Sequence, residues 1–238
     1  MRCSLLALVC RASAQTIFFS EYAEGLSHNK YLEIYNPTSA TIQLHECNTR
    51  ANDTHTLSNF AIFSSNRNSI RCTLTDAFPS VSNAPGTVGF YDHWNSFTAG
   101  ASIKPGEVYV ICHPSADAHI TSRCDQTHTI LSNGDDGYCL AKGKSGAGHY
   151  VLVDCIGDFN GDPGRGWSVC GVTTATRDHT LVRNASVTTG TADWTASAGT
   201  STANCQWIVM PRHTWTHLGS HSMNFFPVDV PTLEVRVP

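Results

Sequence analysis

Charged residues are scarce in this chain. Of its 238 residues, 14% are Asp, Glu, Lys or Arg, whereas soluble domains average about a quarter. The net charge is −4, and no run of lysines and arginines occurs. A surface that binds nucleic acid normally carries such a run to neutralise phosphates. We therefore expect no nucleic-acid partner.

Long apolar segments and catalytic motifs are also missing from the sequence. No stretch approaches the roughly 18 apolar residues of a membrane-spanning helix. The chain contains no G-x-S-x-G, H-E-x-x-H or phosphate-binding glycine motif. Ser, His and Asp are common enough here to form triplets by chance. We expect no membrane span, no cofactor and no enzymatic activity.

Cysteine, by contrast, is abundant. Ten cysteines in a chain of this size are typical of an oxidising compartment. Secretion is also indicated by the N-terminus, where Arg2 precedes a short apolar run over 3–10 and Ala12-Ser13-Ala14 forms a cleavage site. We interpret residues 1–14 as a signal peptide. A retained N-terminal strand is the alternative.

Loss of Cys3 and Cys10 with the signal peptide leaves eight cysteines, which permit many pairings. Proximity in the sequence favours two of them, Cys112 with Cys124 and Cys47 with Cys72. Histidines close to Cys112 raise zinc as an alternative, but the spacing fits no C-x2-C framework. The disulfide candidates are Cys47, Cys72, Cys112, Cys124, Cys139, Cys155, Cys170 and Cys205.

Short apolar runs separated by turn residues fill the remaining chain, and such runs are typical of a β-sandwich. One short helix is expected at 116–123, with Ser115 as its N-cap. Turns are expected at 104–106, 133–137 and 158–166, where glycine, proline, Asn and Asp cluster. The expected strands are 17–22, 31–36, 41–44, 57–63, 68–74, 107–112, 138–141, 150–157 and 167–170. The runs within 178–221 are interpreted as the closing strands.

Several segments follow one another in a distinctive order. Ser20-Glu21 precedes Tyr31-Leu-Glu-Ile-Tyr-Asn-Pro37, and the segments 104–111 and 131–137 come later. Together with 153–167 and 178–221, they resemble the lamin tail domain family, in the extracellular version found in secreted proteins and beside secreted nucleases. This resemblance implies an all-β, immunoglobulin-like β-sandwich over 15–221.

The chain departs from the family pattern in two respects. Cysteines stand at 139, 155 and 170, where a small apolar residue is more usual, which implies a disulfide-reinforced variant. The chain also ends at Pro238, without room for a nuclease domain, so no nuclease activity is carried over. Glu33 and Asn36 match the family motif, and we expect their side chains to satisfy backbone groups.

Two groups of residues resemble metal ligands. Asp158, Asn160 and Asp162 alternate as in a calcium loop, but no glutamate occupies the twelfth position, and an Asx-rich turn is the favoured interpretation. The Asn133-Gly-Asp-Asp136 segment is interpreted in the same way. His213, His217 and His221 would share one face of a helix, but the residues around them favour a strand. We expect no metal site in these segments.

Two sequons for N-glycosylation occur, at Asn52 and Asn184. Both are silent if the source is bacterial. The expected product is otherwise a secreted glycoprotein.

The last segment, 222–238, follows the family-like region. Prolines at 227, 231 and 238 suit an edge strand or an extended arm. One interpretation folds the arm back onto its own sandwich, and the other pairs it with a neighbouring subunit. Head-to-tail pairing that does not close into a ring produces a filament. The apolar candidates for this assembly arm are Val228, Val230, Leu233, Val235 and Val237.

Three functions are compatible with these features. The leading hypothesis is a secreted, non-enzymatic structural protein that self-assembles into an extracellular fibre or matrix by strand exchange. The second is a stand-alone binding or adhesion module for a glycan or an extracellular protein. The third is an accessory domain of a secreted nuclease system.

Overall fold

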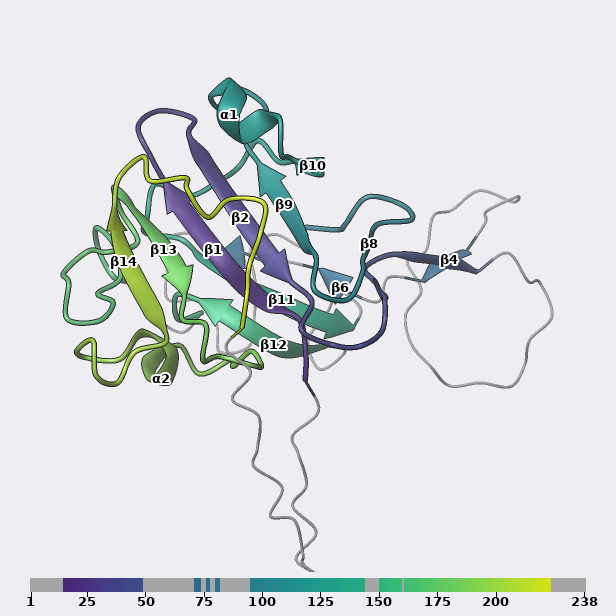
Figure 1. Ribbon diagram of the computed structural model, residues 1–238. Coiled ribbons are helices and arrows are strands. Elements are labelled where there is room, and N and C mark those ends of the chain that lie inside the picture. The colour runs from purple at the N-terminus through teal and green to yellow at the C-terminus, as the bar shows by residue number, and fades with distance from the viewer. Residues whose placement is uncertain are drawn as a thin grey trace, which may run out of the picture.

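The computed structural model describes residues 15–48, 71–73, 76–77, 80–81, 95–143, 150–159 and 161–223 (Figure 1). Most of the ordered elements are strands, and they form two principal sheets. The all-β sandwich expected from the sequence is confirmed. The expected signal peptide, the region around Asn52, Asn160 and the arm residues Val228, Val230, Leu233, Val235 and Val237 lie outside the described residues.

The larger sheet has six strands. In spatial order they are β10 (Gln126–Thr127), β9 (Val108–Cys112), β2 (Lys30–Tyr35), β1 (Phe18–Glu24), β13 (His179–Arg183) and β14 (Trp207–Pro211). The β10–β9 pair is parallel, and the other neighbours are antiparallel.

The second sheet lies behind the first in Figure 1. Its strands are β12 (Tyr150–Ile156), β11 (Gly137–Gly143) and β6 (Asp76–Ala77), with β7 (Ser80–Val81) also beside β11. Two small ladders join β3 (Ile42–Gln43) to β8 (Ser102–Ile103) and β4 (Glu46–Asn48) to β5 (Arg71–Thr73).

The main core fills the space between the sheets. Phe19, Leu32 and Ile34 of the larger sheet belong to one buried cluster with Tyr138 and Leu140 of β11. Side chains alternate between the two faces of a strand, so the opposite face of the larger sheet needs a cover of its own. Full burial of an apolar side chain such as Phe19 or Leu32 stabilises the fold by about 1.5–3 kcal/mol.

The chain after β14 supplies that cover. In Figure 1 this yellow segment crosses the front of the larger sheet. Leu218 packs in a cluster with Tyr31 and Val110, and Met223 packs with Phe18 and Tyr35. Strand β1 is consequently buried along its whole length. We refer to the covered face as the outer face, and to residues 212–223 as the covering segment.

Three sequence expectations need correction. Helix α1 is shorter than expected, Ala118–Thr121, because its N-cap is Asp117, whose Oδ1 accepts a hydrogen bond from His119 N; Ser115 lies in the preceding turn. Segment 167–170 contributes only an isolated bridge from Val169, since Cys170 (φ 55°) turns the chain.

The third correction concerns 178–221, which contains more than strands. Trp194–Ala198 is a helix, α2, capped by Asp193. The segment between β14 and His221 is irregular. The 57–63 strand lies outside the described residues, and only 71–73 of the expected 68–74 strand is described.

Three disulfides fasten the described chain. Cys112–Cys124 ties the end of β9 to the segment after α1, as expected from the sequence, and it leaves no thiolates there for zinc. Cys139–Cys155 joins β11 to β12, and Cys170–Cys205 joins the turn at 170 to the segment before β14. Among the described residues, no helix is long and apolar enough to cross a membrane.

Cys47 and Cys72 are register partners in the β4–β5 ladder. Opposed positions on antiparallel strands bring Cβ atoms to within disulfide range. We therefore predict a fourth disulfide between them. Mass spectrometry of a non-reduced digest should recover a peptide pair linking Cys47 to Cys72. Recovery of either cysteine as a free thiol, or linked elsewhere, would contradict this prediction.

Candidate functional site

A buried ion pair joins the two sheets near one end of the sandwich. Arg183 of β13 and Asp154 of β12 are fully buried, and Nη2 of Arg183 contacts Oδ2 of Asp154. The Asp154 carboxylate also accepts hydrogen bonds from Phe19 N (2.8 Å) and Thr191 N (2.9 Å). Burial raises the pKa of Asp154, while Arg183 and these backbone donors oppose the shift.

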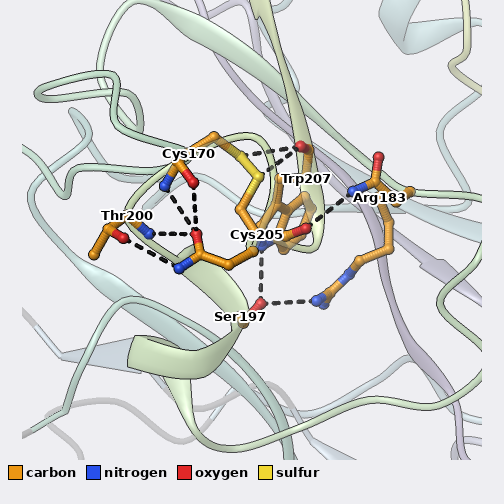
Figure 2. The surroundings of a disulfide bond; sticks show 9 residues. Cys170, Arg183, Ser197, Thr200, Cys205 and Trp207 are labelled. Atoms are coloured by element: carbon orange, nitrogen blue, oxygen red, sulfur yellow. Dashed lines mark hydrogen bonds between the residues drawn. A yellow bond between two sulfur atoms is a disulfide. The ribbon is translucent and has the colours of Figure 1, made fainter.

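Three further N–H groups of Arg183 also donate hydrogen bonds. Its Nε donates to the carbonyl of Phe19, and its Nη1 donates to Ser197 Oγ and Gln206 Oε1, each at 2.9 Å. Figure 2 shows Ser197 of α2 between the guanidinium and the indole of Trp207, whose Nε1 donates to the same oxygen at 2.9 Å. The guanidinium lies 3.9 Å from the centre of the Trp207 ring. Four of the five N–H donors of Arg183 are thus used within the fold, which indicates that Arg183 acts structurally.

The Cys170–Cys205 disulfide lies beside this cluster in Figure 2. The carbonyl oxygen of Trp207 is 3.0 Å from Sγ of Cys170. The disulfide therefore holds the first residue of β14 against the cluster that contains Arg183. Sequence inspection missed this arrangement, because a single arginine in a strand gives no sign of a buried partner.

Removal of one partner from a buried ion pair leaves a charge without compensation, which costs about 3–5 kcal/mol. Arg183→Leu should therefore lower the free energy of unfolding by that amount, measured by urea denaturation with the disulfides intact. The matched control is Arg212→Leu, which removes a half-exposed ion pair to Asp178 and should cost about 1 kcal/mol or less. Equal losses for the two variants would contradict the structural role of Arg183.

Two glutamates form the second polar group, on the outer face. Glu21 of β1 and Glu33 of β2 are register partners, and each is 1% exposed. A register shift between Phe19 and Glu21 places Ser20 as an extra residue in β1. Such a bulge re-aims the neighbouring side chains. Here it lets Ser20 Oγ donate to Glu33 Oε1 at 2.7 Å.

The two carboxyls differ in how fully they are hydrogen-bonded. Glu33 Oε2 accepts from the backbone N–H of Gly219 at 2.6 Å, so the covering segment is attached to β2 through this glutamate. Glu21 Oε1 accepts from the Tyr31 hydroxyl at 2.6 Å. Glu21 Oε2 is buried and has no hydrogen-bond partner among the described residues. Glu21 is thus the less satisfied member of the pair.

A cavity of about 260 Å³ opens beside these glutamates. It lies between the outer face of the sheet and the end of the covering segment. Its apolar wall consists of Val182, Ala185 and Ile208, and its polar wall includes His217 and His221. The ring of His221 packs edge-on against Tyr35 and Phe18, and its Nε2 is buried without a partner among the described residues.

Burial shifts the pKa values of Glu21, Glu33 and His221 in the direction that favours the neutral form of each side chain. Desolvation raises the pKa of Glu21 to about 8, with a further contribution from the nearby charge of Glu33. Desolvation also raises the pKa of Glu33 to about 7, although the hydrogen bonds from Ser20 and Gly219 oppose this. The pKa of His221 falls to about 4 because of burial and the charge of Arg183.

The arrangement suits binding better than acid–base catalysis. A catalytic carboxyl pair has environments that push the two pKa values apart, so that one group is ionised while the other is protonated. Here burial raises both values. The same cavity offers two acceptor groups and an apolar wall to a ligand.

The structure explains Glu33 and Asn36 in the way the sequence predicted. Glu33 accepts a backbone N–H from Gly219, and Asn36 donates to the carbonyls of Ala40 and Ile103. Sequence analysis did not identify Glu21 as a site residue. The available signal was the pair of acidic residues in two adjacent apolar strands, where a buried charge is uncommon.

The calcium candidates lie in a turn. Asp162 Oδ1 accepts from Gly164 N at 2.7 Å, and the carbonyl of Asp158 accepts from Gly161 N. These contacts place Asp158 and Asp162 in tight turns, and Asn160 lies outside the described residues. Asn133 Oδ1 accepts from Lys30 Nζ, so that turn holds a buried lysine. No group of three metal-ligating side chains occurs among the described residues.

The histidines at 213, 217 and 221 lie on irregular chain, and the strand expected there is wrong. His213 has a φ of 66° and packs against Trp215, whereas His217 and His221 line the cavity. Asn184, a glycosylation candidate, is half-buried, and its Nδ2 donates to the carbonyl of Cys205.

No protein-family model, curated protein or solved structure matches the chain. The resemblance to the lamin tail domain family stays a prediction.

The raised pKa values of the glutamates determine how stability depends on pH. A carboxyl with a raised pKa in the folded state stabilises the fold below its unfolded pKa, near 4.5, and this contribution is lost as the pH rises through the folded value. His221 acts in the opposite sense, but only below about pH 6.5. Stability should therefore fall from about pH 4.5 to about pH 8, with His221 offsetting part of the loss below about pH 6.5.

Glu21→Gln should remove part of this loss. Relative to the unmodified protein, its free energy of unfolding should rise by about 1–3 kcal/mol between pH 5 and pH 8.5. Denaturant titrations at the two pH values measure this difference. Glu107→Gln, which replaces an exposed carboxyl, serves as the control and should show little change. An identical pH dependence in all three proteins would show that Glu21 is ionised normally.

Proposed function

We propose that the protein is a secreted, non-enzymatic structural protein that assembles into an extracellular fibre or matrix by strand exchange. In this proposal the C-terminal arm of one copy pairs with β14 of the next. The observation that carries it is the unprotected edge of the larger sheet at β14.

Strand β14 ends the strand order of the larger sheet and pairs only with β13 in the part of the chain that is described. Its residues are Trp-Ile-Val-Met-Pro, without a charge, and Ile208 is 46% exposed. Soluble proteins usually protect such edges with lysines, bulges or a covering loop. Pairing at β14 is limited at its two ends, by the disulfide beside Trp207 and by Pro211, whose carbonyl accepts a hydrogen bond from Thr214 N.

The other edges are less suitable. Strand β10, at the opposite side of the larger sheet, has only two residues. Strand β12 ends the order of the second sheet, but Thr191 accepts a hydrogen bond from Cys155 N, and the chain at Gly190 lies close against Asp154. Of the edges compared, β14 therefore offers an added strand the longest accessible stretch of apolar residues.

The arm has the sequence of a donor strand. Of the expected arm, residues 224–238 follow the covering segment, and Leu233-Glu-Val-Arg-Val237 alternates apolar and charged residues. Fifteen extended residues span at most ~50 Å, enough to reach a neighbouring molecule. Because the donor and acceptor surfaces differ, the contact is head-to-tail, and repetition without ring closure gives a filament.

Secretion is supported by the disulfides, which persist in oxidising compartments. The proposed signal peptide, glycosylation at Asn52 and Asn184, and the immunoglobulin-like lamin-tail relationship rest on the sequence patterns. A second candidate function, an extracellular binding module, is favoured by the cavity beside Glu21. An accessory role in a nuclease system is supported by the resemblance alone.

Removal of 224–238 should abolish assembly and leave a folded monomer, because the donor strand is lost while the covering segment is kept. Ile208→Lys should weaken assembly at least tenfold, since a charge on the edge strand disfavours pairing. Val172→Lys is the matched control, because Val172 is also exposed but lies outside β14. Sedimentation velocity and negative-stain microscopy measure both effects. Fibres of unchanged length in the truncated protein would contradict the proposal.

A further inference from the structure

The cavity beside Glu21 has features of a ligand site that strand exchange does not use. Glu21 is 1% exposed, and its Oε2 has no partner among the described residues. A buried, unsatisfied carboxylate oxygen is costly. The protein tolerates this cost beside a cavity of about 260 Å³. A ligand that donates to Oε2 would remove the cost.

We propose that this cavity binds a primary alkylammonium group, with the ammonium at Glu21 and Glu33 and the alkyl chain along Val182, Ala185 and Ile208. This inference does not depend on the proposed assembly.

The charge of the site favours a cation. Two adjacent buried carboxyls repel one another when both are ionised, and a positive ligand offsets that repulsion. Arg183 also lines the cavity, but its guanidinium is paired with Asp154 and hydrogen-bonded to Phe19, Ser197 and Gln206. Arg183 therefore does not neutralise Glu21, and its guanidinium is not positioned to bind an anion in the cavity.

The donor set favours an organic cation over a metal ion. The described residues bring no three metal ligands together, whereas an ammonium needs only hydrogen-bond acceptors. A primary ammonium has three N–H donors. Glu21 Oε2 takes one, and the carboxylate of Glu33 retains lone pairs beyond those used by Ser20 and Gly219.

The walls favour an alkyl chain behind that ammonium. Val182 of β13 and Ile208 of β14 are register partners on the outer face, and Ala185 adds a third apolar side chain. A lysine side chain and a free small amine share this chemistry. The charged and titratable groups that act on the two glutamates or line the cavity are Tyr31, Asp125, Arg183, His217 and His221.

Calorimetric titration of the full chain with n-butylammonium chloride tests the proposal. At pH 8.5 the probe is still a cation, because alkylamines resemble lysine with a pKa near ~10.4. We expect saturable binding in the millimolar range and a shift of the Gly219 amide resonance. n-Butyltrimethylammonium carries the same charge without N–H donors and should bind at least tenfold more weakly.

The variants distinguish this site from general attraction to a negative protein. Glu21→Gln should weaken n-butylammonium binding at least tenfold, whereas Glu107→Gln, at an exposed carboxyl, should leave it unchanged. Equal binding by the unmodified protein and both variants would overturn the proposal. So would the absence of binding at n-butylammonium concentrations of about 100 mM. Nα-acetyl-lysine methylamide identifies the source: equal binding supports a protein lysine, and weaker binding supports a free amine.

A measurement on the unmodified chain guards against a folding defect in Glu21→Gln. The carboxyl carbon of Glu21 can be titrated by NMR with and without n-butylammonium. Binding to the ionised form should lower the apparent pKa of Glu21 by about one unit when the n-butylammonium concentration is about ten times Kd. An unchanged titration would overturn the proposal whatever the variants do. These readouts report on a site within one molecule, so they do not depend on whether the protein assembles.

Discussion

The structure depends on the buried contact between Arg183 and Asp154. Through it, the central strands β1 and β13 of the larger sheet are fixed to β12 of the second sheet, and Ser197 and Trp207 bring α2 and β14 to the same point. Such a pair adds less to stability than its short contact suggests, because two charges must be desolvated. Its contribution lies in geometry, because the guanidinium contacts β1, β12, α2 and the residue before β14 together, and β14 lies at the edge of the sheet.

A second buried polar group organises the outer face of the larger sheet. A bulge in β1 brings Ser20 and Glu21 beside Glu33, and Gly219 closes over Glu33 by a backbone hydrogen bond. The covering segment thus buries two carboxyls that would otherwise face water. Burial raises the pKa values of both carboxyls, and the covering segment leaves a cavity beside Glu21, whose Oε2 has no hydrogen-bond partner among the described residues. The larger sheet therefore supplies both the proposed assembly edge, at β14, and most of the proposed ligand site.

Local patterns predicted much of this fold. Alternating apolar residues located β1, β2, β9, β11 and β12, and proximity identified Cys112–Cys124. The errors arose where long-range contacts decide the outcome. Cys170 adopts a positive φ that ends the expected strand, and the covering segment is irregular because it binds Glu33 and packs on the sheet. The pairing of Arg183 with Asp154, 29 residues apart, has no local signature. Neither has the bulge that creates the site beside Glu21.

Assembly by strand exchange requires that β14 accept a strand from another copy. Hydrogen exchange, measured residue by residue on the assembled protein and on the monomer, tests this pairing. Alternate amides of β14 already bond to β13 and Pro211 has no N–H, so an added strand would bond the amides of Trp207 and Val209, which point away from β13. Exchange of these amides should slow at least tenfold on assembly, with little change in β9. Unchanged exchange rates throughout β14 in the assembled protein would show that β14 does not accept the added strand.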